Sequence, residues 1–219
     1  MKILAVDTAL GACSVAILSN DKVLAHRFAA MERGHAEALA PMADEAIKES
    51  GIAFVDLDRL GVTTGPGTFT GQRVGLAFMR GLRIALKRPL VGVTSLAAMA
   101  HQAMEETHKK RAAAVHDARR SEVYFELAPA VGPDRGPEIL TFGNAVARIR
   151  NVPGGLALCG TAAPRLIAAL QRADLALSKV TAPDAIWVAR LCAEAPLSEA
   201  PPKPLYLREP DAKLPGERK

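Results

Sequence analysis

Aromatic residues and cysteines are scarce in this chain of 219 residues. It has one Trp, two Tyr and six Phe, so the core must be built mainly from Leu, Val and Ile, and an aromatic platform for single-stranded nucleic acid is not indicated. The three cysteines, Cys13, Cys159 and Cys192, are odd in number, far apart and match no zinc spacing. This usage predicts reduced thiols in a cytoplasmic protein.

Long apolar segments and blocks of like charge are also missing. The apolar N-terminus could imitate a signal peptide, but Asp7 interrupts it, and the charge-free stretch at residues 8–20 is too short to span a bilayer. We therefore expect no membrane association. The 28 basic and 23 acidic side chains give a net charge of +5 and are dispersed over both halves of the chain. Charge alone thus gives little support for direct contact with nucleic acid.

Several catalytic patterns do not occur. None of the five histidines has a second histidine four positions later, so a helical zinc pair is excluded, and no Gly-x-Ser-x-Gly motif is present. The glycine-rich segment 65–75 fits neither a Walker P-loop nor a dinucleotide-binding fingerprint. Asp117 and Arg119 could face a cleft, but a pair that stabilises its own turn is the favoured interpretation.

Alternating strand and helix patterns in the first half predict a mixed sheet covered by helices. The chain opens with a three-stranded meander, and the first helix ends at Gly51 as a C-terminal cap. The predicted strands lie at 2–6, 13–18, 23–28, 59–64 and 89–93, and the predicted helices at about 34–50 and 71–87.

The second half repeats the α/β pattern more irregularly. Six of the fifteen prolines fall in the last 24 residues, which predicts an extended strap there. The two expected lobes comprise residues 1–103 and 104–219. Proline and glycine mark a loop at Pro129, Gly132, Pro133, Gly136 and Pro137. The predicted strands lie at 112–115, 122–127 and 156–159, and the helical segments at 145–149, 162–170 and 185–195.

The turn at residues 65–75 is the most distinctive local feature. It lies between a predicted strand and a predicted helix, where backbone N–H groups and the helix dipole favour an anion. A structural turn that lets helix and strand pack closely explains it as well. Asp7 and Thr8, at the end of the first strand, could hold a phosphate or a magnesium-bound water, although a lone Asp at a turn more often accepts a local hydrogen bond.

The helix over 71–87 has more apolar surface than one sheet can cover. At 100° per residue, Arg73, Arg80, Arg83 and Lys87 fall within an arc of about 80°, and nearly all other positions are apolar or glycine. A helix on its own sheet needs an apolar stripe of roughly 100°, and this one offers about twice that. The surplus predicts a second protein chain on this helix, with the neighbouring helix 34–50 as the alternative cover.

These motifs together resemble the TsaB family, also called YeaZ. The resemblance covers residues 1 to about 213 and is carried by segments 3–8, 65–75, 117–119, 122–124, 206–208 and 211–213. It implies a two-lobed α/β fold of the actin, Hsp70 and sugar-kinase superfamily. It also implies a subunit of the bacterial machinery that makes threonylcarbamoyladenosine in tRNA.

The resemblance further implies a scaffold without its own catalytic site. The catalytic paralogue TsaD carries a His-x-x-x-His pair where this chain has Ser95 and Met99, which cannot replace imidazole ligands. TsaD is the implied partner, the ATPase TsaE docks on the pair, and a homodimer forms when TsaD is absent. tRNA is then reached indirectly through the complex. The implied interface comprises His35, Leu39, Met42, Ala46, Val74, Ala77, Phe78, Gly81, Leu82 and Ala85.

Nucleotide binding is expected to be weak at most. Asp7, Thr8, Gly67 and Thr68 are candidate remnants of the superfamily's nucleotide site, with ATP or ADP and Mg²⁺ bound only at a complex interface and no resident cofactor. The alternative function is a stand-alone enzyme of the same superfamily, either metallopeptidase-like or an ATP-dependent kinase.

Overall fold

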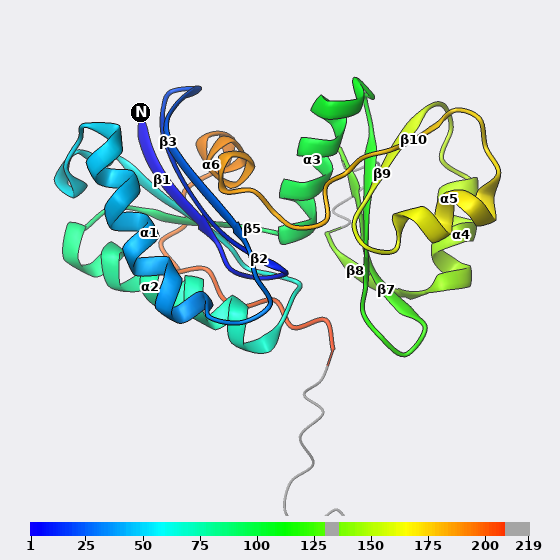
Figure 1. Cartoon of the computed structure of the whole chain (residues 1–219), viewed down its shortest axis with the longest axis horizontal. Helices are drawn as coiled ribbons and strands as arrows, with labels where there is room; N and C mark the ends of the chain where they lie inside the picture. Colours follow the sequence, from blue (N-terminus) through cyan, green and yellow to red (C-terminus); the bar gives the residue numbers. More distant parts are fainter. Residues whose placement is uncertain (130–135, 209–219) are drawn as a thin grey trace, which may run out of the picture.

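The first lobe is a mixed five-stranded sheet with strand order β3-β2-β1-β4-β5. We describe a computed structural model, which covers residues 1–129 and 136–208 (Figure 1). β1 pairs antiparallel with β2 and parallel with β4, so the predicted meander and α/β class are confirmed. The strands are β1 Lys2–Asp7, β2 Ala12–Ser19, β3 Lys22–Ala30, β4 Arg59–Thr63 and β5 Leu90–Val93.

Helices cover both faces of this sheet, which is why β1 and β2 are almost entirely buried. α1 (His35–Ser50) and α2 (Phe69–Leu86) pack on the face that carries Leu4 and Val6. α6 (Ala185–Glu194) packs on the opposite face, against Ile3 and Ala5. Continuous apolar strands of this kind need cover on both sides. A short 3-10 helix, Phe54–Asp56, precedes β4.

Both predicted helices of the first lobe are confirmed, with small differences at their ends. α1 ends at Gly51, whose left-handed backbone (φ 69°) suits a glycine cap. α2 begins at Phe69, two residues earlier than predicted, because the Thr68 hydroxyl caps it by accepting from the Gly71 amide at 3.1 Å.

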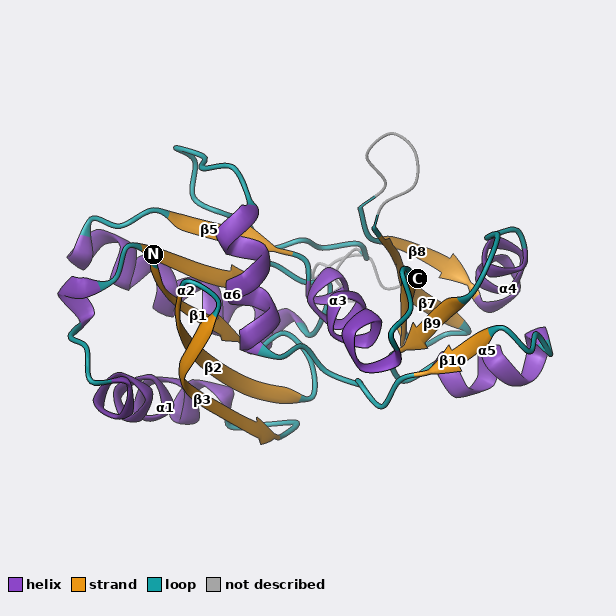
Figure 2. Ribbon diagram, turned by 90° about the horizontal axis from the view of Figure 1, so that it is seen from above, coloured by secondary structure: helices purple, strands orange, loops and turns teal. Residues whose placement is uncertain are grey.

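The second lobe is another five-stranded sheet, with order β10-β9-β6-β7-β8. α4 and α5 cover its outer face, and α3 covers the inner face that looks toward the first lobe (Figure 2). The strands are β6 Ala112–Asp117, β7 Glu122–Ala128, β8 Glu138–Thr141, β9 Leu156–Cys159 and β10 Leu175–Leu177, and the helices are α3 Ser95–Thr107, α4 Phe142–Arg150 and α5 Ala163–Leu170.

Four elements were not predicted from the sequence: the 3-10 helix at Phe54–Asp56, α3, β8 and β10. The predicted division at residues 103 and 104 falls within α3, and α6, from the segment 104–219, packs on the first sheet. Of the predicted proline and glycine loop, Gly132 and Pro133 lie outside the described residues. Pro129, Gly136 and Pro137 flank that segment, between β7 and β8.

The described part of the C-terminal segment, residues 196–208, forms neither helix nor strand, which confirms the predicted strap; the rest of that prediction, 209–219, lies outside the described residues. The strap runs across α2 and the end of β4. The Leu205 amide donates to the Thr64 carbonyl at 2.8 Å. Arg80 donates to the Pro202 carbonyl at 2.5 Å and Arg83 to the Glu199 carbonyl at 3.1 Å. The strap therefore covers the arginine side of α2.

Candidate functional site

Asp7 ends β1 in a fully buried position. One carboxylate oxygen, Oδ1, accepts from the Thr63 hydroxyl at 2.5 Å and from the Ala9 amide at 3.1 Å. The other, Oδ2, is buried and has no hydrogen-bond partner among the described residues. Burial raises the pKa of Asp7 from 3.8 to about 7, and the nearby carboxylate of Asp184 adds to the increase. Asp7 is thus a local hydrogen-bond acceptor in a fully buried site.

Thr8 joins the end of β1 to the first turns of α2. Its hydroxyl donates to the Gly71 carbonyl at 2.7 Å and accepts from the Gly75 amide at 3.0 Å. A Cβ on Gly71 would lie 2.1 Å from the Thr8 carbonyl oxygen, and one on Gly75 would lie 2.7 Å from the Thr8 hydroxyl. These glycines are required because the helix and the turn after β1 approach each other at backbone distance.

Gly67 makes the same kind of contact. A Cβ there would lie 2.1 Å from the Ala9 carbonyl oxygen, and the adjacent Thr68 amide donates to that oxygen at 2.8 Å. The structure brings the predicted nucleotide contacts Asp7, Thr8, Gly67 and Thr68 to one place. The hydroxyls of Thr8 and Thr68 hold α2, and the Ala9 carbonyl fills the position that a side chain at Gly67 would need. The geometry fits a close-packed turn better than a phosphate cradle.

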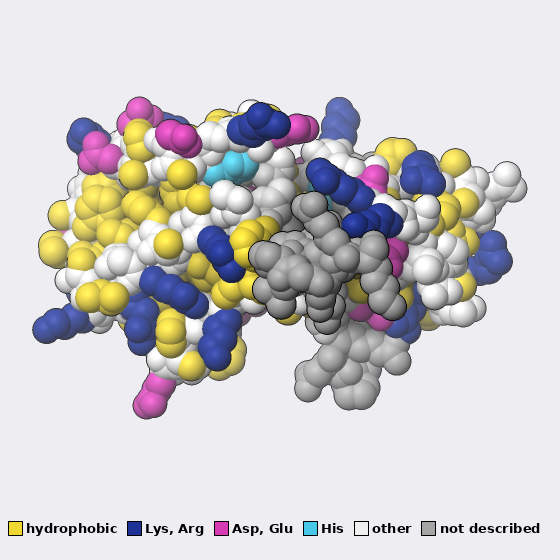
Figure 3. Space-filling view, turned by 90° about the horizontal axis from the view of Figure 1, so that it is seen from below, with side chains coloured by type: hydrophobic (Ala, Val, Ile, Leu, Met, Phe, Trp, Pro, Cys, Tyr) yellow, Lys and Arg dark blue, Asp and Glu magenta, His cyan; other side chains and the backbone are white. Residues whose placement is uncertain are grey.

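The outer side of α2 is apolar and uncovered. Ala77, Gly81 and Ala85 are exposed, and nothing lies within 4 Å of the point where a Cβ on Gly81 would be. Ile84 is 74% exposed. Figure 3 shows hydrophobic side chains gathered on the lobe that carries α1 and α2, with Lys and Arg side chains around them. We call Ala77, Gly81, Ile84 and Ala85 the outer row of α2.

The remaining predicted interface residues of α2 lie at the edge of the outer row. Val74, Phe78 and Leu82 are half-buried and pack against the core of the first lobe. α1 and α2 contact each other, so part of the apolar surplus that the sequence indicated is covered within the chain. The outer row is the part that no described element covers.

The α1 residues of the predicted interface are mostly internal. Leu39 and Ala46 belong to the buried core, and the buried His35 ring contacts the Leu10 carbonyl at 3.1 Å. Arg27 of β3 pairs with Glu45 and Glu49 of α1. Met42, at helical spacing from those two carboxylates, therefore shares the side of α1 that faces β3.

The other positions singled out in the sequence have structural roles here. The Arg119 amide donates to the Asp117 carboxylate at 2.7 Å, which confirms the turn-stabilising pair. Ser95 is buried and its hydroxyl donates to the Pro66 carbonyl at 2.5 Å, while Met99 is part of the core around α3. Within residues 1–129 and 136–208, no group of three or more His, Cys, Asp or Glu side chains is arranged to hold a metal ion.

The cysteines are free and buried, and burial raises their thiol pKa values, to about 11 for Cys13 and about 12 for Cys192. Glu126 of β7 is a second buried carboxyl. It accepts from the Thr94 hydroxyl at 2.6 Å, and burial raises its pKa from 4.5 to about 7. No helix in the described part of the chain is long and apolar enough to cross a membrane.

One cluster was not predicted from the sequence: the stack of Phe69 and Tyr206 with Arg73. The two rings lie 5.3 Å apart between centroids, and the Arg73 guanidinium lies 3.6 Å from the centre of the Phe69 ring. Phe69 and Tyr206 are far apart in the chain, so only the path of the strap brings them together. The closing Tyr206 motif was the available signal, but it does not reveal the contact.

The fold defines a class: two-lobed α/β proteins built from two mixed five-stranded sheets that helices cover. Among solved structures, YeaZ from Pseudomonas aeruginosa matches with a TM-score of 0.78 and 29% identity, over 94% of this chain and 99% of that one. A family model described as "TsaD: tRNA N6-adenosine threonylcarbamoyltransferase" matches residues 22–135.

Curated relatives place the chain within that class. The TsaB protein of Escherichia coli, named for tRNA threonylcarbamoyladenosine biosynthesis, is 39% identical over 125 residues, which are 57% of this chain and 54% of that protein. The chain thus spans about half the length of this relative. An uncharacterized protein of Mycobacterium tuberculosis is 36% identical over 96% of this chain and 93% of its own. The chain belongs to the TsaB (YeaZ) family.

Proposed function

We propose that the chain is a non-catalytic subunit of the assembly that makes N6-threonylcarbamoyladenosine in tRNA. In this proposal it works in the cytoplasm, docks on a TsaD subunit through the outer row of α2 and helps to recruit TsaE. The names of its relatives and the matching family model support the pathway. A resident cofactor is not part of the proposal, and ATP or ADP with Mg²⁺ would bind weakly, at the interface of the complex.

The observation that carries the proposal is the uncovered outer row. Small exposed residues let the backbone of another helix approach closely, and a half-buried apolar border extends the contact. Helices pack in this way when the ridges of one enter the grooves of the other. A paralogue of the same fold would present equivalent helices, so a bundle of helices from two subunits is the expected interface. A second copy of this chain would use the same surface when TsaD is absent.

Co-purification with TsaD tests the surface. Ala77→Glu places a charge in the outer row without removing a core contact, and we expect it to abolish co-purification while the circular dichroism spectrum stays unchanged. Leu82→Asp should act in the same direction but also perturbs the core, so Ala77→Glu is the cleaner variant. Lys87→Glu, at the exposed end of the same helix, is the control and should leave the complex intact.

Reconstitution of tRNA modification with and without the chain tests the role. We expect modification by TsaD and TsaE to require this chain and to be lost with Ala77→Glu. Unchanged co-purification of Ala77→Glu would show that the outer row is not the interface. Metal-dependent peptide cleavage or phosphoryl transfer by the isolated chain would favour the alternative of a stand-alone enzyme.

A further inference from the structure

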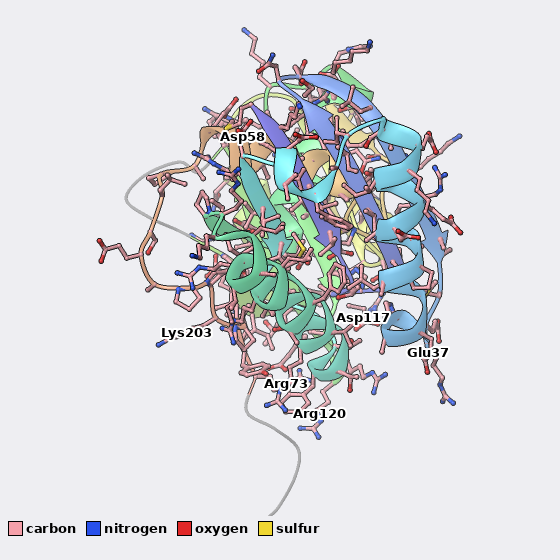
Figure 4. All side chains as sticks on the ribbon, turned by 90° about the vertical axis from the view of Figure 1, so that its left-hand side faces the viewer. Glu37, Asp58, Arg73, Asp117, Arg120 and Lys203 are labelled. Atoms are coloured by element: carbon pink, nitrogen blue, oxygen red, sulfur yellow. The ribbon has the colours of Figure 1, made fainter. Side chains whose placement is uncertain are left out.

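We propose that a hollow at the C-terminal end of α2 binds a small molecule that carries a phosphate group on an apolar body. The hollow has a volume of about 450 Å³ and lies between the end of α2, Arg88 and Pro89 after it, and the first residues of the strap. We call it the basic hollow. Figure 4 looks onto α2 and shows the strap passing beside the helix, with Lys203 labelled on the strap and Arg73 at the helix end away from the hollow.

Three basic side chains line the basic hollow without an acidic partner. They are Arg83, Lys87 and Arg88, and no ion pair within residues 1–129 and 136–208 involves any of them. Glu199 is the acidic residue of the lining, and it is exposed and unpaired among the described residues. The lining therefore has surplus positive charge, which favours an anionic ligand.

The two guanidinium groups are only partly used by the fold. Arg83 Nη2 donates to the Glu199 carbonyl at 3.1 Å, and Arg88 Nη2 donates to the Val55 carbonyl at 3.0 Å. These acceptors are neutral and engage one nitrogen of each guanidinium, so the charges stay unbalanced. Arg88 Nε is buried and has no hydrogen-bond partner among the described residues. A buried donor without an acceptor calls for an explanation, and a ligand at the hollow supplies one.

The other two polar side chains of the hollow are accessible. Lys87 and Ser198 are exposed, and their side chains make no hydrogen bond within the described part of the chain. Two guanidinium forks, an ammonium group and a hydroxyl match a dianion with three terminal oxygens, such as a phosphate ester. A carboxylate has two oxygens and a single charge, so it would leave part of this set unpaired. The donor set therefore favours phosphate.

Apolar side chains border the charged part of the basic hollow. Ile84 is 74% exposed and Leu197 is 58% exposed, and Pro89 between them in the sequence is half-buried. A ligand that covers such surface gains from its removal from water. Inorganic phosphate has no apolar part for these walls. The volume and the walls together fit an organic body attached to the phosphate group.

The helix end alone does not explain the three basic residues. The C-terminus of a helix carries a partial negative charge, and basic side chains in the last turn stabilise it. This effect accounts for Arg83 and Lys87. Arg88 lies beyond the end of α2, where the effect of the helix dipole fades. Neighbouring like charges also repel one another, and a bound anion removes that repulsion.

Isothermal titration calorimetry with the full chain tests the proposal. Phenyl phosphate is the probe, inorganic phosphate is the anion without a body, and benzoate is the same ring with a singly charged carboxylate. We expect phenyl phosphate to bind with a Kd below about 1 mM, and the other two to bind at least about tenfold more weakly. The affinity should fall when the salt concentration is raised from about 50 to about 200 mM.

Charge reversals locate the binding energy. Lys87→Glu changes an accessible side chain without a partner among the described residues, and it should weaken binding of phenyl phosphate about tenfold or more. Arg83→Met should act in the same direction but also releases the Glu199 carbonyl of the strap. Lys203→Glu is the matched control, because Lys203 is exposed on the same strap outside the hollow, and it should leave the affinity unchanged.

Nitrogen-15 NMR of the arginine side chains shows where the probe binds. The Nε–H signals of Arg83 and Arg88 should shift when phenyl phosphate is added. The signal of Arg172 should not shift, because its guanidinium pairs with Asp174 in the second lobe.

Three results would overturn the proposal: no binding of phenyl phosphate at about 10 mM, equal affinity of Lys87→Glu and the unmodified chain, or binding of benzoate as tight as that of phenyl phosphate. Anion binding is independent of docking on TsaD, although Ile84 belongs to both surfaces. Lys87→Glu is expected to keep the complex with TsaD. Loss of phenyl phosphate binding with retained co-purification therefore concerns the basic hollow alone, and failure of either proposal leaves the other standing.

Discussion

α2 carries small residues on two different sides, and the two rows have different causes. On the inner side, Gly71 and Gly75 are small because the turn after β1 lies against them at backbone distance. On the outer side, a Cβ placed on Gly81 would meet no described residue within 4 Å, and Ala77 and Ala85 are exposed. The arginine side between them is covered by the strap.

Small residues in a helix can therefore reflect either contacts within the chain or contacts with another molecule. A glycine in a helix lowers the stability of the fold relative to alanine, so its presence calls for a structural explanation, such as a close contact. For the inner row the reason lies within this chain. For the outer row, residues 1–129 and 136–208 offer none, and a neighbouring molecule that approaches closely is the explanation that the proposed function supplies.

The burial of Asp7 at the end of β1 gives the largest expected effect. The pKa of Asp7 is about 7 in the folded chain against 3.8 ordinarily, so its stabilising contribution is complete below pH 4 and is lost as the pH rises through 7. The difference corresponds to about 4 kcal/mol. Asp7→Asn should match the unmodified chain near pH 4 and be progressively more stable than it toward pH 8. Urea unfolding at several pH values measures this, and parallel pH profiles would contradict it.

A matched pair of glycine substitutions compares the two rows directly. Gly71→Ala places a Cβ 2.1 Å from the Thr8 carbonyl oxygen and should lower the free energy of unfolding by about 3 kcal/mol. Gly81→Ala meets no neighbour and should raise the same quantity by about 0.5 to 1 kcal/mol. Chemical denaturation of both variants checks the prediction. Similar losses in the two variants would abolish the distinction between the rows.

Loss of the Thr8 hydroxyl, which contacts the inner row, should lower the free energy of unfolding by somewhat less. Thr8→Val removes the donor to the Gly71 carbonyl and the acceptor for the Gly75 amide without changing the side-chain shape, and it should cost about 2 kcal/mol. Thr70→Val, at an exposed position of the same helix, is the control and should stay within about 0.5 kcal/mol of the unmodified chain. Thermal unfolding followed by circular dichroism distinguishes the two outcomes.

Substitution on the arginine side of α2, which the strap covers, should have the smallest effect on the free energy of unfolding. Arg80→Met removes the hydrogen bond to the Pro202 carbonyl but keeps an apolar stem, and it should cost about 1 kcal/mol. Limited proteolysis should then cleave residues 196–208 faster. Lys110→Met, at an exposed position just before β6, is the control and should leave both measurements unchanged. An equal effect of the two variants would mean that the strap is not held by this bond.

Local patterns predicted much of the first lobe. Amphipathic periodicity and a glycine cap located α1, and the long apolar pattern located α2, because each of these helices has one face on a sheet. α3 lacks such a pattern because it contacts β6, β7 and β9 on one side and α6 on another. β10 is a three-residue edge strand paired only with β9, which is too short to carry a period.

The sequence predicted that α2 carries a contact surface, but not which of its residues remain exposed in the fold. The apolar surplus of α2 pointed to a contact surface, but the sequence did not show which part of it the core would take up, as for Phe78 and Leu82. The nucleotide candidates Thr8 and Thr68 lie together as expected, yet their hydroxyls are already engaged by α2. Such competition between local and tertiary partners is visible only in three dimensions.

The position of α6 has a consequence for synthesis of the protein. Its residues are made after those of every other described helix, yet it buries Ile3 and Ala5 of the first strand. Arg59 then fixes its C-terminal end by donating to the carbonyls of Ala193 and Ala195 at 3.2 and 3.1 Å. A nascent chain that stops before residue 185 leaves one face of its first sheet open to water and to chaperones. The N-terminal lobe therefore completes its folding only after most of the C-terminal lobe has left the ribosome.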